Sequence, residues 1–222
     1  MIQIAGIRDW PEARLLIDCG VNYLGFPLRL AVHREDLTEA VAAAIVAKLP
    51  SECHGVAITY LDSAATIAEL VDFLGVQFIQ LHGPITPVEL HRLRSLRPDL
   101  KIIKGLIVGT HSVDTLYSIL DTLHPLVDAF ITDTYDPATG ACGATGKVHD
   151  WGVSRELVKR SPKPVILAGG LNPENVAAAI KHVNPAGVDV HTGVEDASGR
   201  KDRDKVERFL AASRHHFAAQ VL

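Results

Sequence analysis

The sequence predicts an α/β protein, a closed (β/α)8 TIM barrel formed by a single domain over residues 1–222. Short apolar runs alternate with helical segments about eight times, at roughly 25 residues per unit. No two expected strands are joined by a hairpin signal, so the strands should run parallel. The alternative, an open doubly wound sheet, would favour a glycine fingerprint after the first strand, where the chain has only Ala5-Gly6-Ile7.

The strands are expected to be short, β-branched and aliphatic runs, a composition typical of strands that are buried on both faces of a parallel sheet. In chain order they are predicted at 2–5, 22–26, 55–60, 76–81, 101–104, 127–132, 165–167 and 187–190.

The helices follow the strands in turn. Asp9 caps the first helix, Pro11 and Glu12 lie in its opening turn, and Gly20 ends it. The second helix is expected to end near residue 48. The others are expected at 64–74, 87–96, 112–123, from about 150, from 172, and from 202 to about 215.

Composition excludes several classes of partner. Hydrophobic residues make up 47% of the chain and charged residues 22%, and the net charge is −4, which argues against nucleic-acid and membrane-surface partners. No apolar run approaches the roughly 20 residues of a membrane helix, and the opening MIQIAGIRDW is unlike a signal peptide. Three cysteines, odd in number and without metal spacing, suit a reducing cytoplasm. We therefore expect a cytoplasmic protein.

A phosphate site is predicted around Val165–Ile180, VILAGGLNPENVAAAI. Gly169 and Gly170 let the backbone approach a ligand, and Asn172 with the proline behind it is a helix-start signal. In a barrel this turn lies beside the one after the eighth strand, at Thr192-Gly193, where this fold usually binds phosphate. Each turn alone is an ordinary tight turn, but the two together favour a phosphate ligand.

Two acidic residues at strand ends are candidates for chemistry. Asp133 directly follows the strand FIT, where an ionisable group is placed for catalysis, although a turn or cap aspartate is the simpler alternative. Asp189 lies inside the apolar run GVDVH and must be hydrogen-bonded or charge-paired, for function or as a structural link. Because strand side chains alternate, His191 should share the face of Asp189.

Two further polar residues are weaker candidates. Arg34, in the loop after the second strand, could bind a carboxylate at the barrel mouth, although a solvated arginine beside Glu35 and Asp36 is the simpler interpretation. His82, in IQLHG, could hydrogen-bond a ligand or brace a loop. No histidine, carboxylate or cysteine cluster has the spacing of a metal site.

Several longer motifs resemble the phosphoribosylanthranilate isomerases of tryptophan biosynthesis. They are IQLHG at 79–83, DTYDPATGACGATGKVHDW at 133–151, LAGGLNPENV at 167–176 and VDVHTGVE at 188–195, with GIRD at 6–9, LGF at 24–26 and GRKD at 199–202. The resemblance covers nearly the whole chain and implies the barrel.

The resemblance also implies a reaction. The family converts an N-linked phosphoribosyl aminoaldose into an aminoketose by an Amadori rearrangement, without a cofactor or metal. It implies that Asp133 is the general acid that opens the sugar ring, that Arg34 binds the substrate carboxylate, and that the turns at Gly169-Gly170 and Thr192-Gly193 bind the phosphate. His82 and Asp189 are expected to contact the substrate. The expected partner is this small phosphorylated sugar, and members of this fold family occur as monomers and homodimers.

The main departure lies in the first strand. The family's general base is a cysteine in a Lys-Ile-Cys-Gly motif, which here reads Gln3-Ile4-Ala5-Gly6. A general base contributes about 10²–10⁴-fold in rate, and alanine cannot move a proton. Because Gln3 also replaces the lysine, natural divergence explains Ala5 better than an engineered substitution does.

Two residues are candidates to compensate. His191 stands where the family usually has serine, and we expect it to help hold the phosphate, with a role as substitute base as the second hypothesis. Cys142 is another candidate thiol, with an unreactive small residue in the loop as the simpler interpretation.

Three functions are consistent with these residues. The first is an isomerase of this family, and the second is a diverged paralogue with another phosphorylated, carboxylate-bearing substrate. The third is a binder of phosphoribosyl ligands that performs no catalysis. All three predict phosphate binding, so only turnover distinguishes them.

Overall fold

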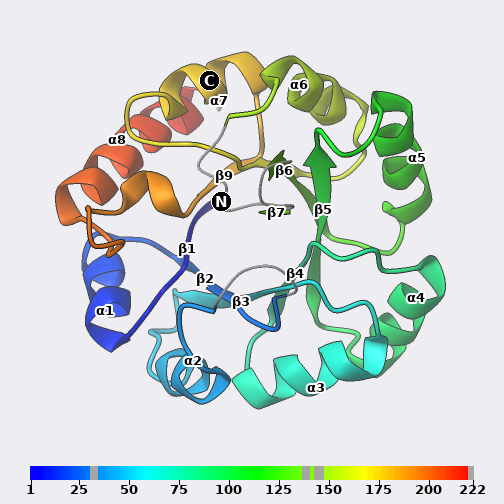
Figure 1. The fold of residues 1–222 in the computed structure, drawn as a ribbon, viewed down its shortest axis with the longest axis horizontal. Helices are drawn as coiled ribbons and strands as arrows, with labels where there is room; N and C mark the ends of the chain where they lie inside the picture. The colour runs from blue at the N-terminus through cyan, green and yellow to red at the C-terminus, as the bar shows by residue number, and fades with distance from the viewer. Residues whose placement is uncertain (31–34, 137–140, 143–147, 220–222) are drawn as a thin grey trace.

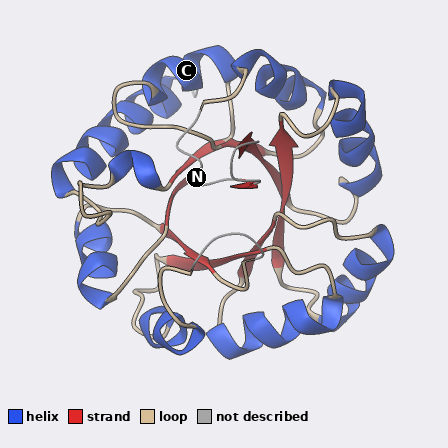
Figure 2. Cartoon of the chain, in the orientation of Figure 1, coloured by secondary structure: helices blue, strands red, loops and turns tan. Residues whose placement is uncertain are grey.

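A closed barrel of eight parallel strands forms the centre of the protein, and helices surround it (Figures 1 and 2). The computed structural model describes residues 1–30, 35–136, 141–142 and 148–219. Hydrogen-bonded neighbours follow the order β5-β4-β3-β2-β1-β9-β8-β6, and pairing of β5 with β6 closes the ring. The predicted (β/α)8 barrel is confirmed.

The barrel strands begin and end close to the predicted positions. They are β1 (Ile2–Ala5), β2 (Tyr23–Pro27), β3 (His54–Thr59), β4 (Phe78–Leu81), β5 (Lys101–Val108), β6 (Ala129–Asp136), β8 (Val165–Leu167) and β9 (Gly187–Val190). β5 and β6 run four residues beyond their expected ends, so the strand pairing here extends further toward the mouth of the barrel.

The outer helices also follow the expected order. They are α1 (Trp10–Asp18), α2 (Glu39–Val46), α3 (Ala64–Leu74), α4 (Pro87–Leu96), α5 (Val113–Leu123), α6 (Trp151–Arg160), α7 (Val176–Val183) and α8 (Arg203–Ala219), with the 3₁₀ helix η1 (Thr192–Val194) after β9. The Asp9 carboxylate accepts a hydrogen bond from the Glu12 N–H at 3.0 Å, as its predicted capping role requires. No helix in the described part of the chain is long and apolar enough to span a membrane.

Two local predictions were wrong. No hairpin was expected, yet the end of β6 pairs antiparallel with β7 (Ala141–Cys142). The helix expected from Asn172 begins only at Val176, because the Asn172 side chain accepts hydrogen bonds from the N–H groups of Glu174 and Asn175 and so stabilises a turn instead.

The side chains form an outer apolar layer and a mixed interior. Residues that alternate outward from the strands pack against the helices, with Ile4, Phe26 and Phe130 fully buried there. The interior holds two small apolar clusters, one of which contains Ala5, Val56 and Ile58. The remaining interior positions include buried polar side chains from β1, β4, β6 and β9, and these lead to the site: Gln3, Gln80, His82, Asp133 and Asp189.

Candidate active site at the carboxyl ends of the strands

A small cavity opens where β6, β8 and β9 end. Seven of the residues singled out from the sequence line it: Asp133, Gly169, Gly170, Asp189, His191, Thr192 and Gly193. Its volume is about 30 Å³, close to the space one water molecule occupies in the liquid, so it marks the floor of a site. Residues that are far apart in the chain therefore meet where catalytic groups of this fold lie.

The two glycine turns pack directly against each other. A β-carbon on Gly193 would lie 1.9 Å from the Leu171 carbonyl oxygen, so only glycine permits this approach. Gly169 has a φ of 93°, and a β-carbon there would lie 2.2 Å from the Thr134 hydroxyl oxygen. Asn175 holds the first turn by donating from its side chain to the Gly170 carbonyl at 2.9 Å. The corner is therefore built before any ligand binds.

Asp133 lies within β6 and is buried, with 6% of its surface exposed. Its Oδ1 accepts a hydrogen bond from the Thr134 N–H at 2.7 Å. Burial raises the pKa of Asp133 to about 7; the Thr134 hydrogen bond opposes the rise and the negative charge of Asp189 adds to it. This carboxyl can therefore hold or release a proton near neutral pH.

His149 contacts Thr134, the residue after Asp133, and was not singled out from the sequence. Its Nδ1 lies 2.9 Å from the Thr134 hydroxyl and its Nε2 lies 2.6 Å from the Ser154 hydroxyl. Burial lowers the pKa of His149 to about 4, so the ring is neutral and links β6 to α6. Its position between Thr134 and Gly169 could be found only from the fold.

Asp189 is the second buried acid of the cavity, with 7% of its surface exposed. Burial raises its pKa to about 7, while the neighbouring Gln3 side chain and the positive charge of Lys201 oppose the rise. Gln3 is its partner in the β1–β9 register. Asp189 Oδ1 has no hydrogen-bond partner among the described residues.

Gln3 begins a chain of polar side chains across the barrel interior. Its Nε2 donates to Gln80 Oε1 at 2.9 Å, and Gln80 Nε2 lies 2.7 Å from His82 Nε2. Burial, together with the charge of Lys104, lowers the pKa of His82 to about 3, so its ring is neutral. His82 does not line the cavity. Its side chain contacts Gln80 in this row of polar residues.

His191 lines the cavity but also faces two carboxylates. Its ring lies over Gly6, and its Nε2 is 3.4 Å from Glu195 Oε1 and 3.7 Å from Asp36 Oδ2. Lys201, whose side chain is fully buried, donates to the His191 carbonyl at 3.1 Å and pairs with Glu195 at 2.7 Å. These contacts hold the ring of His191 beside the glycine turns, where the expected phosphate contact requires it.

Three other sequence candidates are placed differently. Ala5 is buried on β1, and its neighbours in the interior cluster are Val56 and Ile58. Arg34 lies outside the described residues. Cys142 belongs to β7, where only the backbone is described.

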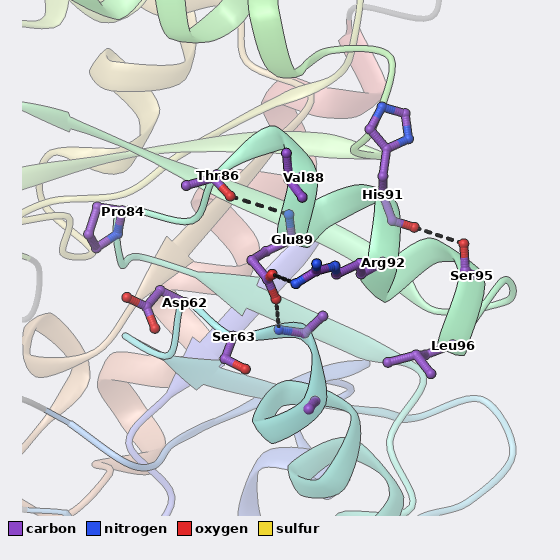
Figure 3. A pocket seen from close by; sticks show the side chains of 12 residues that line it. Asp62, Ser63, Pro84, Thr86, Val88, Glu89, His91, Arg92, Ser95 and Leu96 are labelled. Atoms are coloured by element: carbon purple, nitrogen blue, oxygen red, sulfur yellow. Dashed lines mark hydrogen bonds and ion pairs between the residues drawn. The ribbon is translucent and has the colours of Figure 1, made fainter.

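A much larger groove lies on the outside of the barrel, between α3 and α4 (Figure 3). Its volume is about 900 Å³, but its main charged group is already paired, since Glu89 accepts from the Ala64 N–H at 2.8 Å and from Arg92 at 2.6 Å. None of the sequence candidates lines it. The candidate catalytic residues therefore lie in the smaller cavity at the strand ends.

Comparison with known proteins gives consistent relatives. A family model described as N-(5'phosphoribosyl)anthranilate (PRA) isomerase matches residues 2–212. N-(5'-phosphoribosyl)anthranilate isomerase 2 of Methanosarcina mazei is 38% identical over 218 residues, which cover 97% of this chain and 95% of that protein. The solved phosphoribosyl anthranilate isomerase of Thermococcus kodakaraensis has a TM-score of 0.77 at 29% identity, covering 96% of this chain and 98% of that one. Another solved phosphoribosyl anthranilate isomerase, in complex with reduced 1-(o-carboxyphenylamino)-1-deoxyribulose 5-phosphate, has a TM-score of 0.77 at 25% identity, with the same coverage.

Proposed function

The chain belongs to the N-(5'-phosphoribosyl)anthranilate isomerase family, and on this premise we propose how its own residues perform the family's reaction. The protein is an aldose–ketose isomerase of tryptophan biosynthesis that acts on a small phosphorylated substrate. The observation that carries the proposal is the buried carboxyl of Asp133, which faces a cavity between two glycine turns.

Asp133 is the general acid in this proposal. It protonates the ring oxygen of the phosphoribosyl group, which opens the sugar and leaves a C1′=N bond to the anthranilate nitrogen. A pKa of about 7 supports this role, because an acid with a pKa near the working pH is both protonated and able to give up its proton. The hydrogen bond from the Thr134 N–H then stabilises the carboxylate that remains.

The two glycine turns hold the phosphate. Gly169-Gly170 and Thr192-Gly193 offer backbone at the ends of adjacent strands, and their tight packing keeps this backbone in place. His191 adds positive charge beside them, held by Asp36 and Glu195. Asp189 contacts the sugar from the floor of the cavity.

The other end of the substrate carries the anthranilate carboxylate. We propose Arg34 as its partner because a guanidinium binds a carboxylate with two parallel hydrogen bonds. We place the protein in the cytoplasm and expect a monomer or a homodimer, which analytical ultracentrifugation distinguishes.

A turnover assay tests the proposal. Phosphoribosylanthranilate is incubated with the protein, and the loss of its anthranilate-type fluorescence is followed. We expect turnover by the wild-type chain and a fall in kcat of about 10²–10⁴-fold for Asp133→Asn. Asp62→Asn, in the outer groove, is the matched control and should retain the wild-type rate.

The same assay distinguishes the alternatives. A wild-type chain that binds reduced 1-(o-carboxyphenylamino)-1-deoxyribulose 5-phosphate tightly but never turns over the substrate would be a non-catalytic binder. A chain that neither binds this analogue nor turns over phosphoribosylanthranilate would be a paralogue with another substrate.

A further inference from the structure

The position of the family's cysteine is occupied by a methyl group. Ala5 lies in an apolar cluster with Val56 and Ile58, and none of these three side chains can accept a proton. Among the described titratable side chains, Asp189 and His191 line the cavity together with Asp133. These two, with His82 from the sequence candidates, are the replacements for the thiol that we compare.

Both histidines are poor replacements. His82 does not line the cavity, its Nε2 is engaged by Gln80, and a pKa of about 3 makes it a weak base. The His191 Nε2 is engaged by Glu195 and Asp36, at 3.4 and 3.7 Å.

We propose that Asp189 is the general base of this chain and takes the C2′ proton that the family's cysteine takes elsewhere. Asp189 lines the same cavity as Asp133 and the two glycine turns, and its Oδ1 has no partner among the described residues. Its charge and that of Asp133 act on each other, so the pair readily holds one proton and resists a second ionisation. One protonated and one ionised carboxyl are the acid and the base that the reaction needs.

The neighbour of Asp189 explains why the carboxylate is available. Gln3 is opposite Asp189 in the β1–β9 register, at the position where the resemblance places a lysine in the family. A lysine there would pair with the carboxylate and hold it in the ionised form as a weak base. The neutral amide of Gln3 removes that charge, so the replacements at positions 3 and 5 have one common explanation.

The polar chain from Gln3 can serve Asp189 in both protonation states. In the observed orientation Gln3 donates to Gln80, which leaves Gln3 Oε1 as a buried acceptor without a described partner and suits a protonated Asp189. An amide has nearly the same shape when its oxygen and nitrogen exchange places. With both amides reversed, Gln3 donates to an ionised Asp189, Gln80 donates to Gln3, and the neutral ring of His82 donates to Gln80.

The proton balance closes within the carboxyl pair. Asp133 gives its proton to the ring oxygen, the bond from C1′ to that oxygen breaks, and the nitrogen lone pair forms the C1′=N bond. Asp189 then takes the C2′ proton, a C1′=C2′ bond forms, and the C1′=N electron pair returns to nitrogen. The resulting enol loses its O2′ proton to Asp133 and gains one at C1′ from Asp189, so the pair ends with the single proton it began with.

This inference rests on the proposed isomerase function, and a rescue experiment tests it. Four chains are compared in the fluorescence assay: wild type, Asp189→Asn, Asp189→Asn with Ala5→Cys, and Asp133→Asn with Ala5→Cys. We expect Asp189→Asn to lower kcat about 10²–10⁴-fold. Adding Ala5→Cys to Asp189→Asn should raise kcat at least tenfold, because a thiol at position 5 supplies another base. Adding Ala5→Cys to Asp133→Asn should leave kcat unchanged.

Two further readouts separate a catalytic base from a structural residue. The Asp189→Asn chain should bind reduced 1-(o-carboxyphenylamino)-1-deoxyribulose 5-phosphate within threefold of wild type and unfold cooperatively. In the rescued chain, the acidic limb of the kcat profile should move from near 7 toward the ordinary thiol value of about 8.5. The charged groups that interact with Asp189 are Asp133 and the Lys201 ammonium. Neither residue is changed in the rescued variant.

The outcomes that overturn the inference differ from one another. If the wild type turns over substrate and Asp189→Asn retains its kcat, the base assignment alone is overturned. The same holds if Asp189→Asn loses analogue binding as well as turnover. Iodoacetamide that abolishes wild-type turnover would assign the base to a native thiol such as Cys142. Absence of wild-type turnover overturns both the proposed function and this inference.

Discussion

Replacing Asp133 by asparagine should change how the stability of the fold depends on pH. Burial is the main cause that raises the pKa of Asp133 from the usual 3.8 to about 7. The folded chain therefore keeps a proton that the unfolded chain releases near pH 4. Between these values the folded state binds more protons than the unfolded state, so stability falls as the pH rises and levels off above about 7.

The magnitude follows from the width of this interval. One pKa unit corresponds to about 1.36 kcal/mol, so the two units between pH 5 and pH 7 amount to about 2.7 kcal/mol of unfolding free energy. Asparagine has the same shape as aspartate, keeps an oxygen that can accept from the Thr134 N–H, and does not titrate. Between pH 5 and pH 7 we therefore expect the unfolding free energy of Asp133→Asn to fall by about 2 to 3 kcal/mol less than that of the wild type.

Urea unfolding at pH 5, 6, 7 and 8 measures the effect, with Asp62→Asn as the matched surface control. The Asp133→Asn curve should be flatter than the wild-type curve, and the variant should be the more stable protein at pH 8. A variant whose stability declines in parallel with the wild type would refute the argument that burial holds a proton on Asp133.

Three other substitutions test the remaining contacts. His191→Ser should raise KM about tenfold and lower kcat less, since it removes a positive charge beside the phosphate turns; lost turnover with intact analogue binding would instead make His191 the base. Gln3→Lys should move the acidic limb of the kcat profile down by at least one pH unit and lower kcat about tenfold, because the ammonium would stabilise ionised Asp189. Gly193→Ala should cost about 1–3 kcal/mol of stability in urea unfolding and weaken analogue binding, because its β-carbon would strike the Leu171 carbonyl. Gly193 is not among the glycines with a positive φ, so this cost comes from the clash and not from backbone strain.

Local patterns predict the barrel and the meeting of the two glycine turns well. The alternation of apolar strands with helices defines the repeated strand–helix unit of the barrel. The glycines at 169–170 and 193 follow β8 and β9, which lie side by side. The prediction failed where local signals competed. Asn172 has the side chain of a helix cap, yet its hydrogen bonds close a turn, and α7 begins at Val176. The pairing of β6 with β7 was missed although Pro137 and Gly140, which lie between the two strands in the sequence, are typical turn residues.

The polar interior was the part that the sequence did not predict. Gln3 and Gln80 are 77 residues apart, and their contact depends on which strands face each other across the barrel. Extending the inward–outward alternation to every strand would have placed both side chains inside. No such signal exists for His149, whose contact with Thr134 depends on where a long loop returns to the barrel.

The replacements at positions 3 and 5 are best understood as two changes to one proton transfer. A general base must be ionised when substrate binds and basic enough to take a proton, which requires a pKa near the working pH. A lysine beside Asp189 would make the carboxylate a counter-ion and leave the proton transfer to a thiol. On the proposed assignment, burial gives Asp189 the required basicity once that lysine is absent, and the thiol becomes dispensable. On this reasoning a chain that lost the cysteine but kept the lysine would have an acid and no base.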